Sequence, residues 1–510
     1  MFINQDGAPH LYNAYIILEL LKDNPAFTEI YALNPAMIPN LTGHWFLAFL
    51  LLLFSPTTAT KIIVTFCFAG FVAAVGWLRY QVAGRDGIFT ALLLGAALGF
   101  NWMWFLGFYN FIIGVIGFAF TIGIYWRWRG NLNFYRTFVI SILVILVYLS
   151  HLISFAMLVG SLFLLSVFVS PASIKRTVIY TLASFLPVAP FVISYKLASE
   201  SGGQISPVWR HIENFFSIPN WITQMQTADL FQLMSRKAFP LVSFDSTFFA
   251  AFSPIIWIAL ALLFLSLGIF FSQQKDEIFS RRFLPFTLLA FSSIVFWIFA
   301  PDDFGKSHGS FLRERVLLCG LICFVPLFKT GDNFRFLSLA RICLIIVIVF
   351  QTAILWEYSF YADSVGREYL SAKEKIGNND SIGSILLMKN SCRYKSNPLT
   401  NINVLNGIGK NTRVWDNYEL GYYLFPVIAL NQSDKDFIYN FRESNAFELC
   451  DANEKMDEKL ARLTTLLELN NEKIGVMVVW GKDERIEAFL KKWYKEPFFQ
   501  NERVSIYAHQ

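Results

Sequence analysis

An acidic side chain and a histidine, Asp6 and His10, stand close together at the amino-terminal end of the chain. Some forty residues later the sequence becomes almost continuously apolar, so these two side chains lie beside a membrane-embedded region. An enzyme that acts on a lipid-linked substrate needs its ionisable groups in such a place. Because a carboxylate at a partly dry interface can have its pKa raised toward the range of a general base, we predict Asp6 as the catalytic residue. The alternative is a carboxylate that is merely solvated near the terminus.

Further polar side chains could bind the phosphate and the sugar of such a substrate. A guanidinium group matches phosphate oxygens bidentately, and burying an unneeded arginine at the head of a span is costly, which favours a function for Arg313 and Arg315. Histidines could donate hydrogen bonds or a proton to the phosphate, and aromatic rings could stack on the sugar. The alternatives are a helix cap for His10, a polar turn residue at His151 and a structural ion-pair cluster around Glu314. The predicted substrate-binding residues are His10, Tyr109, Asn110, His151, His308, Arg313 and Arg315.

The composition is that of a helical membrane protein. Of the 510 residues, 55% are hydrophobic and only 15% are charged, whereas a soluble chain carries roughly 25% charged residues. Apolar runs of about 18 residues recur between residues 61 and 356. The net charge of +5 lies mainly in short loops, which indicates membrane orientation rather than a nucleic-acid surface. We predict a mainly α fold: a polytopic transmembrane bundle of about ten spans, interfacial helices on the outer face and a small C-terminal α/β domain.

Basic residues fall in alternate loops between the predicted spans. The positive-inside rule therefore places these loops in the cytoplasm and most of the chemically capable side chains on the outer side. Basic loops at both ends of the apolar stretch 137–170 require two crossings between them, so we predict a turn at Ser150-His151. The same alternation leaves no crossing for the short apolar run 41–54, so we predict an interfacial or re-entrant helix on the outer side. The predicted spans are 61–78, 87–104, 108–126, 137–150, 152–170, 174–195, 250–271, 283–300, 314–328 and 339–356.

Charged residues become frequent again after about residue 358, and the tail is long enough for one soluble domain. Strand-prone runs alternate with segments of helical spacing, which predicts a small α/β domain. Residues 415–420 could hold a sugar through their aromatic and acidic side chains, although we favour an ordinary turn and strand edge. The predicted strands are 385–388, 402–405, 474–480 and 504–508, and the predicted helices are 359–376, 454–469 and 484–493. The predicted domains are 1–60 (an outer-face first loop with amphipathic and interfacial helices), 61–356 (transmembrane) and 357–510 (extracytoplasmic α/β).

No spacing of cysteine or histidine predicts a zinc or haem site, so the predicted site contains no metal ligand. The neighbouring acids Asp302 and Asp303 could ligate a divalent metal, or they could form only a solvated loop or a helix cap. Cys392 and Cys450 in the tail could form a disulfide if the tail faces an oxidising compartment.

The layout of these features resembles the C-type glycosyltransferases (GT-C), of the mannosyltransferase and aminoarabinose-transferase kind. These polytopic enzymes take a sugar from a polyprenyl-phosphate carrier on the outer face of the membrane. The resemblance covers the membrane half, and the tail resembles the soluble outer domain that many members carry. It implies that Asp6, the acidic residue of the first outer loop, is the catalytic base. The matching segments are Asp6-Gly7-Ala8-Pro9-His10-Leu11-Tyr12-Asn13-Ala14, Leu33-Asn34-Pro35 with Pro39-Asn40, the span pair ending at Arg79, Gly107-Phe108-Tyr109-Asn110-Phe111 and the outer loop 301–315.

Members of that family carry a transmembrane helix before the acidic loop, and this sequence begins just before Asp6, so we expect that a first helix is missing because the start is placed too late. We predict a glycosyltransferase of the inner (plasma) membrane with an extracytoplasmic C-terminal domain. Its partners would be a polyprenyl-phosphate sugar donor, a lipid or glycan acceptor and membrane lipids, but no nucleic acid. The alternatives are a ligase of lipid-linked glycans that uses residues 196–249, and a non-catalytic transporter or scaffold; nearly uncharged span centres disfavour a transporter.

Overall fold

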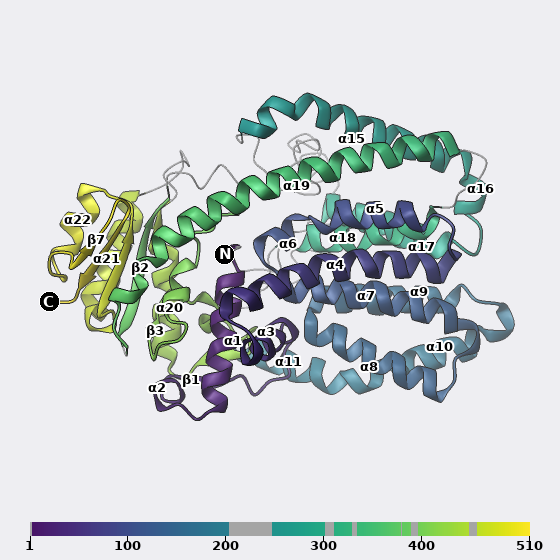
Figure 1. Cartoon of the computed structure of the whole chain (residues 1–510). Helices are drawn as coiled ribbons and strands as arrows, with labels where there is room; N and C mark the ends of the chain where they lie inside the picture. The colour runs from purple at the N-terminus through teal and green to yellow at the C-terminus, as the bar shows by residue number, and fades with distance from the viewer. Residues whose placement is uncertain are drawn as a thin grey trace.

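The computed structural model describes residues 3–202, 247–300, 311–328, 334–378, 380–388, 396–447 and 456–510. These residues form a bundle of long helices and, at one end of it, an α/β domain built from the C-terminal part of the chain (Figure 1). The N-terminal segment lies where the two parts meet. The protein is therefore mainly helical with a small sheet region, as its composition predicts.

Four helices among the described residues are long and apolar enough to cross a membrane: Pro56–Ala83, Tyr109–Asn131, Pro171–Leu197 and Arg335–Lys375. Six shorter apolar helices of 10–17 residues accompany them. Large apolar side chains such as Phe134 remain exposed on the bundle, as expected of a surface that faces lipid. The bundle comprises α4 (Pro56–Ala83), α5 (Ile88–Gly99), α6 (Trp102–Leu106), α7 (Tyr109–Trp128), α8 (Phe134–Ser150), α9 (Leu152–Val167), α10 (Pro171–Phe185), α11 (Ala189–Gly202), α15 (Thr247–Gln273), α16 (Lys275–Ile278), α17 (Leu284–Phe299), α18 (Leu312–Phe324) and α19 (Phe334–Leu370).

Two helix boundaries in this bundle test the sequence analysis. The break predicted at Ser150-His151 is confirmed, because α8 ends at Ser150 and the extended backbone of His151 starts α9. The Nδ1 atom of His151 accepts a hydrogen bond from the backbone N–H of Ile153 at 3.1 Å and so caps the new helix. The predicted span 87–104 is wrong as one continuous helix. Asn101 divides it by capping α6, since its side chain accepts a hydrogen bond from the N–H of Trp104.

The basic loops gather at the end of the bundle that lies opposite the α/β domain (Figure 1). Arg281, after α16, donates a hydrogen bond to the carbonyl of Val169, between α9 and α10, at 2.8 Å. Arg282 donates one to the carbonyl of Val82, at the end of α4, at 2.7 Å. The molecule therefore has one basic end and one end that carries the α/β domain.

The N-terminal segment is built into the α/β domain rather than lying apart from it. Helix α1 (Gly7–Leu21) is buried on nearly all sides, although the sequence predicts an amphipathic helix. Strand β1 (Tyr31–Leu33), after the short helix α2 (Pro25–Thr28), pairs antiparallel with β4 (Val427–Ala429). Helix α3 (Thr42–Leu53) follows, at the place of the predicted interfacial helix, and packs against α1.

The α/β domain contains a mixed sheet in which β3, β2, β6, β8 and β7 lie side by side, and β5 also pairs in parallel with β2. The predicted strands at 385–388, 474–480 and 504–508 correspond to β2, β6 and β8. The predicted strand 402–405 is wrong, because residues Ile402–Asn406 form a 3-10 helix. The predicted boundary at residue 357 falls inside α19, which continues without a break from the bundle into this domain. The elements are β2 (Ser381–Leu387), β3 (Arg413–Val414), the 3-10 turn η7 (Tyr418–Gly421), α20 (Gln432–Ser444), β5 (Ala446–Phe447), α21 (Met456–Asn470), β6 (Val476–Trp480), α22 (Glu484–Leu490), β7 (Phe499–Gln500) and β8 (Val504–Ala508).

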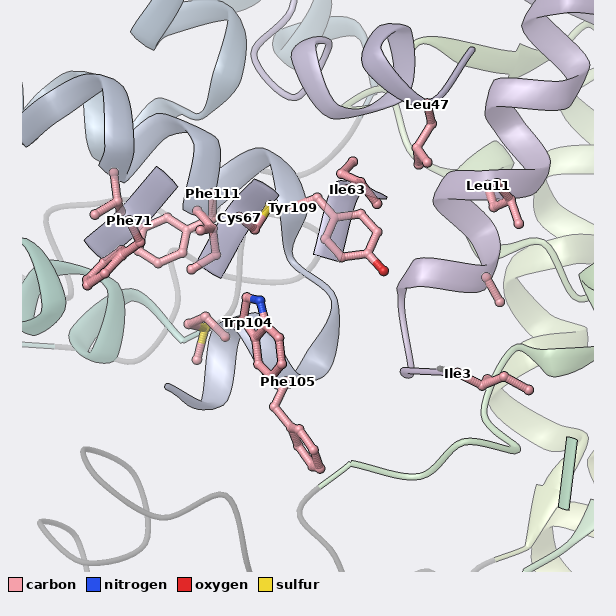
Figure 2. Packing of buried hydrophobic residues seen from close by; sticks show 14 of the residues in the cluster. Ile3, Leu11, Leu47, Ile63, Cys67, Phe71, Trp104, Phe105, Tyr109 and Phe111 are labelled. Carbon is pink, nitrogen blue, oxygen red and sulfur yellow. The ribbon is translucent and has the colours of Figure 1, made fainter. Parts of the chain in front are cut away.

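Buried apolar side chains join α1 to the bundle (Figure 2). Leu11 of α1 faces Leu47 of α3, and Tyr109 at the start of α7 lies between Ile63 and α1. The Tyr109 hydroxyl points toward the chain that leads into α1 and donates a hydrogen bond to Oδ1 of Asn4 at 3.1 Å. This packing fixes the position of the polar side chains that α1 carries.

Candidate functional site

Asp6 lies where α1, the bundle and the α/β domain meet. It is the residue before α1, and its backbone N–H donates to the carbonyl of Leu106 at the end of α6, at 2.8 Å. The carboxylate is buried, with an exposure of 7%. Burial raises its pKa to about 6, against the lowering influence of His10, of Arg442 and of a hydrogen bond with Tyr418. Asp6 therefore has the environment of a general base that works near neutral pH.

His10, one turn along α1, meets two other buried side chains from distant parts of the chain. Its Nδ1 atom lies 3.0 Å from Nε2 of His44 in α3 and 2.5 Å from Oε1 of Glu419 in η7. The Nε2 atom of His44 lies 2.8 Å from Oε2 of Glu419. We call His10, His44 and Glu419 the acceptor cluster, since two imidazole nitrogens and a carboxylate converge there.

The backbone before α3 fixes the orientation of the His44 ring. Asn40 adopts a left-handed conformation with a φ of 75°, which asparagine tolerates, and its carbonyl lies 3.0 Å from Nδ1 of His44. A carbonyl oxygen can only accept, so this contact suits a proton on Nδ1. The amide nitrogen of Asn110 lies 3.3 Å from the same Nδ1, and Nε2 faces the carboxylate of Glu419. Asn110 holds the start of α3 by accepting the N–H of Gly43 at 2.6 Å. A Cβ atom at Gly43 would lie 2.8 Å from the same Asn110 oxygen, so only glycine allows this approach.

Glu419 is fully buried and is held by the amide network of its neighbours. Asn13 of α1 donates to its Oε2, and Asn417 donates to Oδ1 of Asn13 at 2.7 Å. Burial alone would raise the pKa of Glu419, but the charges of His10 and His44 lower it to about 2. Oε1 lies 2.5 Å from Nδ1 of His10, and this pairing also lowers the pKa of Glu419. The carboxylate thus faces the two imidazoles as an anion.

A second histidine site lies nearby on the bundle. Nη1 of Arg315, in α18, lies 3.0 Å from Nε2 of His151. The guanidinium also packs over the rings of Phe108 and Phe111, at 4.9 and 5.5 Å from their centroids. Because the N–H of Ile153 donates to Nδ1 of His151, the proton of the neutral ring is on Nε2 and faces the guanidinium N–H groups. Arg315 and His151, which we call the donor pair, therefore direct donors toward one another.

One corner of the chain, residues 106–111, touches both sites. Leu106 contacts Asp6, and Phe108 and Phe111 contact Arg315. The corner turns at Gly107, which has a φ of 92° and approaches Gly7 so closely that a Cβ atom would lie 2.7 Å from the Gly7 nitrogen. Glycine is required here on both counts. Asp6 and the donor pair are thus separated by the width of this corner.

The structure brings together most of the residues that the sequence analysis selected. His10 lies beside Asp6, Tyr109 and Asn110 support α1 and α3, and His151 meets Arg315. Arg313 lies two residues before Arg315 and faces another side of α18, since residues two apart on a helix do not share a face. His308, Asp302 and Asp303, the residues of the ligase alternative at 203–246, and Cys392 and Cys450 lie outside the described residues.

The sequence analysis did not include His44 or Glu419 in the site. His44 lies in an apolar helix with no chemical neighbour in sequence, and Glu419 lies in the segment 415–420 that we interpreted as a turn and strand edge. Residues 418–421 do form a turn, of 3-10 type, but it directs Glu419 inward. The available signal was the acidic and aromatic composition of that segment.

Comparison with known proteins adds no family assignment. No protein-family model matches the chain, and no curated protein sequence matches it significantly. The function must therefore be inferred from the geometry of the two sites.

Proposed function

We propose that this protein is a membrane glycosyltransferase of the GT-C type, which moves a sugar from a polyprenyl-phosphate carrier to a lipid or glycan acceptor. The observation that carries the proposal is the placement of Asp6 and the donor pair on two sides of the corner at residues 106–111. A buried carboxylate is suited to take a proton from an acceptor hydroxyl, and converging donors are suited to hold a phosphate.

In the proposed reaction, Asp6 takes the proton of the acceptor hydroxyl as its oxygen bonds to the anomeric carbon of the sugar. The bond between that carbon and the phosphate oxygen breaks, and the polyprenyl phosphate leaves with the electron pair. Arg315 and His151 donate hydrogen bonds to the departing phosphate, whose negative charge increases. A phosphate oxygen placed between Nη1 of Arg315 and Nε2 of His151 would accept from both, which resolves the opposition of two donors.

The surroundings of the donor pair offer a place for the polyprenyl chain. An open cleft lies between α6 and α18, next to Arg315 along the same helix. Leucines of α18 and the indole ring of Trp102 in α6 give it an apolar side against which a lipid chain could pack, and Asn101 and Glu314 make the rest polar. It is lined by Asn101, Trp102, Met103, Glu314, Leu317, Leu318 and Leu321.

We further propose that the bundle crosses an inner (plasma) membrane about ten times, with the α/β domain on the outer face. The shorter apolar helices would then cross the bilayer with the four longer ones. Support comes from the basic loops among the described residues, which lie at the end opposite the α/β domain and would face the cytoplasm. Asp6 and the donor pair would face the side on which polyprenyl-linked sugars are used.

The test is sugar transfer by the purified full chain in detergent, with radiolabelled polyprenyl-phosphate sugars as donors and an envelope lipid extract as acceptor. We expect transfer by the wild type, and a loss of at least about 1,000-fold in Asp6→Asn, which keeps the shape of the side chain but removes the base. Asp363→Asn, at a carboxylate paired with Arg367 on the exposed part of α19, is the matched control and should retain transfer.

Two results would contradict the proposal. Near-normal turnover in a folded Asp6→Asn protein would exclude Asp6 as the base. Release of free polyprenyl-linked sugar across a vesicle membrane without transfer would favour a transporter instead.

A further inference from the structure

The acceptor cluster brings two imidazole nitrogens and a carboxylate close enough together to share one ion. We propose that Nδ1 of His10, Nε2 of His44 and the carboxylate of Glu419 bind a divalent transition-metal ion, for which Zn²⁺ is the best match. The inference does not depend on the proposed glycosyl transfer, since it rests on the cluster alone and is tested by metal content.

The spacing of the ligand atoms fits a shared ion. The two imidazole nitrogens lie 3.0 Å apart, and the carboxylate oxygens lie 2.5 and 2.8 Å from them. Ligands bound at about 2.1 Å in a tetrahedral zinc site lie about 3.4 Å from one another, so the three groups would move apart by roughly 0.4–0.9 Å to hold the ion. All three side chains are buried, with exposures of 5, 0 and 0%. Such burial removes the competition of bulk water for the ion.

The contacts around the cluster are those of a metal site. The Nδ1 atom of His44 lies 3.0 Å from the Asn40 carbonyl, an arrangement that metal-ligating histidines commonly show, and its Nε2 lies 2.8 Å from Oε2 of Glu419. The Nδ1 atom of His10 lies 2.5 Å from Oε1 of the same carboxylate. A bound cation would displace the protons that otherwise lie between the imidazoles and the carboxylate, so that all three groups direct lone pairs at one ion.

The chemistry of the donors selects the kind of ion. Two imidazole nitrogens and one carboxylate are the ligand set of many zinc sites with an open position, whereas Ca²⁺ and Mg²⁺ prefer oxygen ligands alone. The outer contacts of a metal site are also present, because Asn13 donates to Glu419 and Asn40 accepts from His44.

The proposed ion would join three separate parts of the chain. His10 belongs to α1, His44 to α3 and Glu419 to η7 of the α/β domain, 375 positions after His44 in the chain. Binding therefore stabilises the folded junction, since the ligands meet only there.

The experiment measures metal content and thermal unfolding of the full chain purified in detergent. After removal of metal with a chelator and exposure to Zn²⁺ alone, we expect about one tightly held zinc ion per wild-type chain and a rise in the midpoint of unfolding. Glu419→Gln and His44→Gln should bind zinc at least about 100-fold more weakly and show no zinc-dependent rise. The matched controls are Asp416→Asn, at a buried carboxylate in the same domain, and His151→Gln, at a buried histidine outside the cluster; both should bind zinc as the wild type does.

X-ray absorption at zinc in the wild-type chain keeps the test valid if the cluster variants fail to fold. Two imidazole nitrogens and a carboxylate oxygen at about 2.0–2.2 Å would support the proposal. A wild type that binds no zinc, a zinc shell with sulfur or without imidazole, or equal zinc binding by Glu419→Gln would overturn it.

Discussion

The acceptor cluster and the donor pair are opposite in character although both are built on a buried histidine. At His44 a backbone carbonyl lies 3.0 Å from Nδ1, and Nε2 faces a site that contains a carboxylate. At His151 a backbone N–H donates to Nδ1, and Nε2 faces a guanidinium. The backbone group at Nδ1 and the charge beside Nε2 are therefore opposite at the two rings, which suits one site to a cation and the other to an anion.

The comparison also shows how an unsatisfied arrangement indicates a ligand. Buried polar groups are normally paired within the protein, and groups of one kind that converge leave a free-energy cost. A zinc ion would suit the converging acceptors of the acceptor cluster, and a phosphate oxygen would suit the converging donors of the donor pair. Three variants test the contrast between the two sites.

The largest expected effect concerns Asp416, a buried carboxylate three residues before Glu419 that meets no histidine. Burial raises its pKa from 3.8 to about 6, although hydrogen bonds from Ser384 and Asn403 oppose the rise. The folded state therefore holds the proton more tightly than the unfolded state, and stability falls as the pH rises from about 4 to about 6. The loss amounts to about 3 kcal/mol at pH 7, since one pKa unit corresponds to about 1.4 kcal/mol.

We expect Asp416→Asn to remove this dependence, because the amide stays neutral and can still bond to Ser384 and Asn403. Thermal unfolding between pH 4 and pH 7 should show the variant as more stable at pH 7 and equal to the wild type near pH 4. A constant difference across that range would show that the pKa of Asp416 is not raised. The histidine neighbours of Glu419 would then not explain why the two carboxylates differ in pKa.

A smaller effect is expected at the donor pair. Arg315→Met keeps the packing against Phe108 and Phe111 but removes the charged donor. Loss of one charge-assisted hydrogen bond to a phosphate should weaken binding of undecaprenyl phosphate about 10- to 100-fold, or about 1.4–2.8 kcal/mol. Native mass spectrometry with undecaprenyl phosphate and with undecaprenol measures the difference.

Two comparisons decide whether this effect belongs to the donor pair. Arg367→Met removes an exposed guanidinium of α19 and should leave phosphate binding unchanged. Arg315→Met should also leave the zinc content unchanged. If the variant loses both phosphate binding and zinc, the donor pair and the acceptor cluster belong to a single site.

The smallest effect is expected at the corner that joins the sites. Gly107→Ala introduces a Cβ atom 2.7 Å from the Gly7 nitrogen, whereas Gly409, with a similar φ of 81°, has no atom within 4 Å. Both substitutions strain a positive φ, so their difference isolates the close approach. We expect Gly107→Ala to lower the free energy of unfolding by about 1 kcal/mol more than Gly409→Ala does, in denaturant titrations of the full chain. Equal losses would show that Asp6 is not held by contact with this corner.

The sequence predicted the helical bundle well because its signals are local. Apolar length indicates a membrane helix, and the alternation of basic loops led to the helix break at Ser150-His151. In the α/β domain, strands β2, β6 and β8 were predicted from short apolar runs. The run at 402–405 has the same composition but forms a 3-10 helix, because its neighbours in space rather than its own residues decide its conformation.

Some residues of the site were predicted and others were not, and the difference has a physical reason. Asp6, His10 and His151 were selected because each carries reactive chemistry in an apolar setting. Glu419 was not selected, because nothing near it in sequence shows that it meets residues 10 and 44. A metal search by spacing fails for the same reason, since the three side chains come from segments far apart in the chain.

The sequence by itself determined the membrane-type bundle, the small C-terminal α/β domain and the presence of reactive residues near the amino terminus. These follow from composition, apolar length and charge, which each segment carries independently of the others. Only the tertiary structure decided which of the reactive residues face each other and which backbone group meets Nδ1 of each histidine. At His44 this group is the Asn40 carbonyl and at His151 it is the Ile153 N–H, and a side chain meets such a backbone group in its final geometry only after the chain has folded.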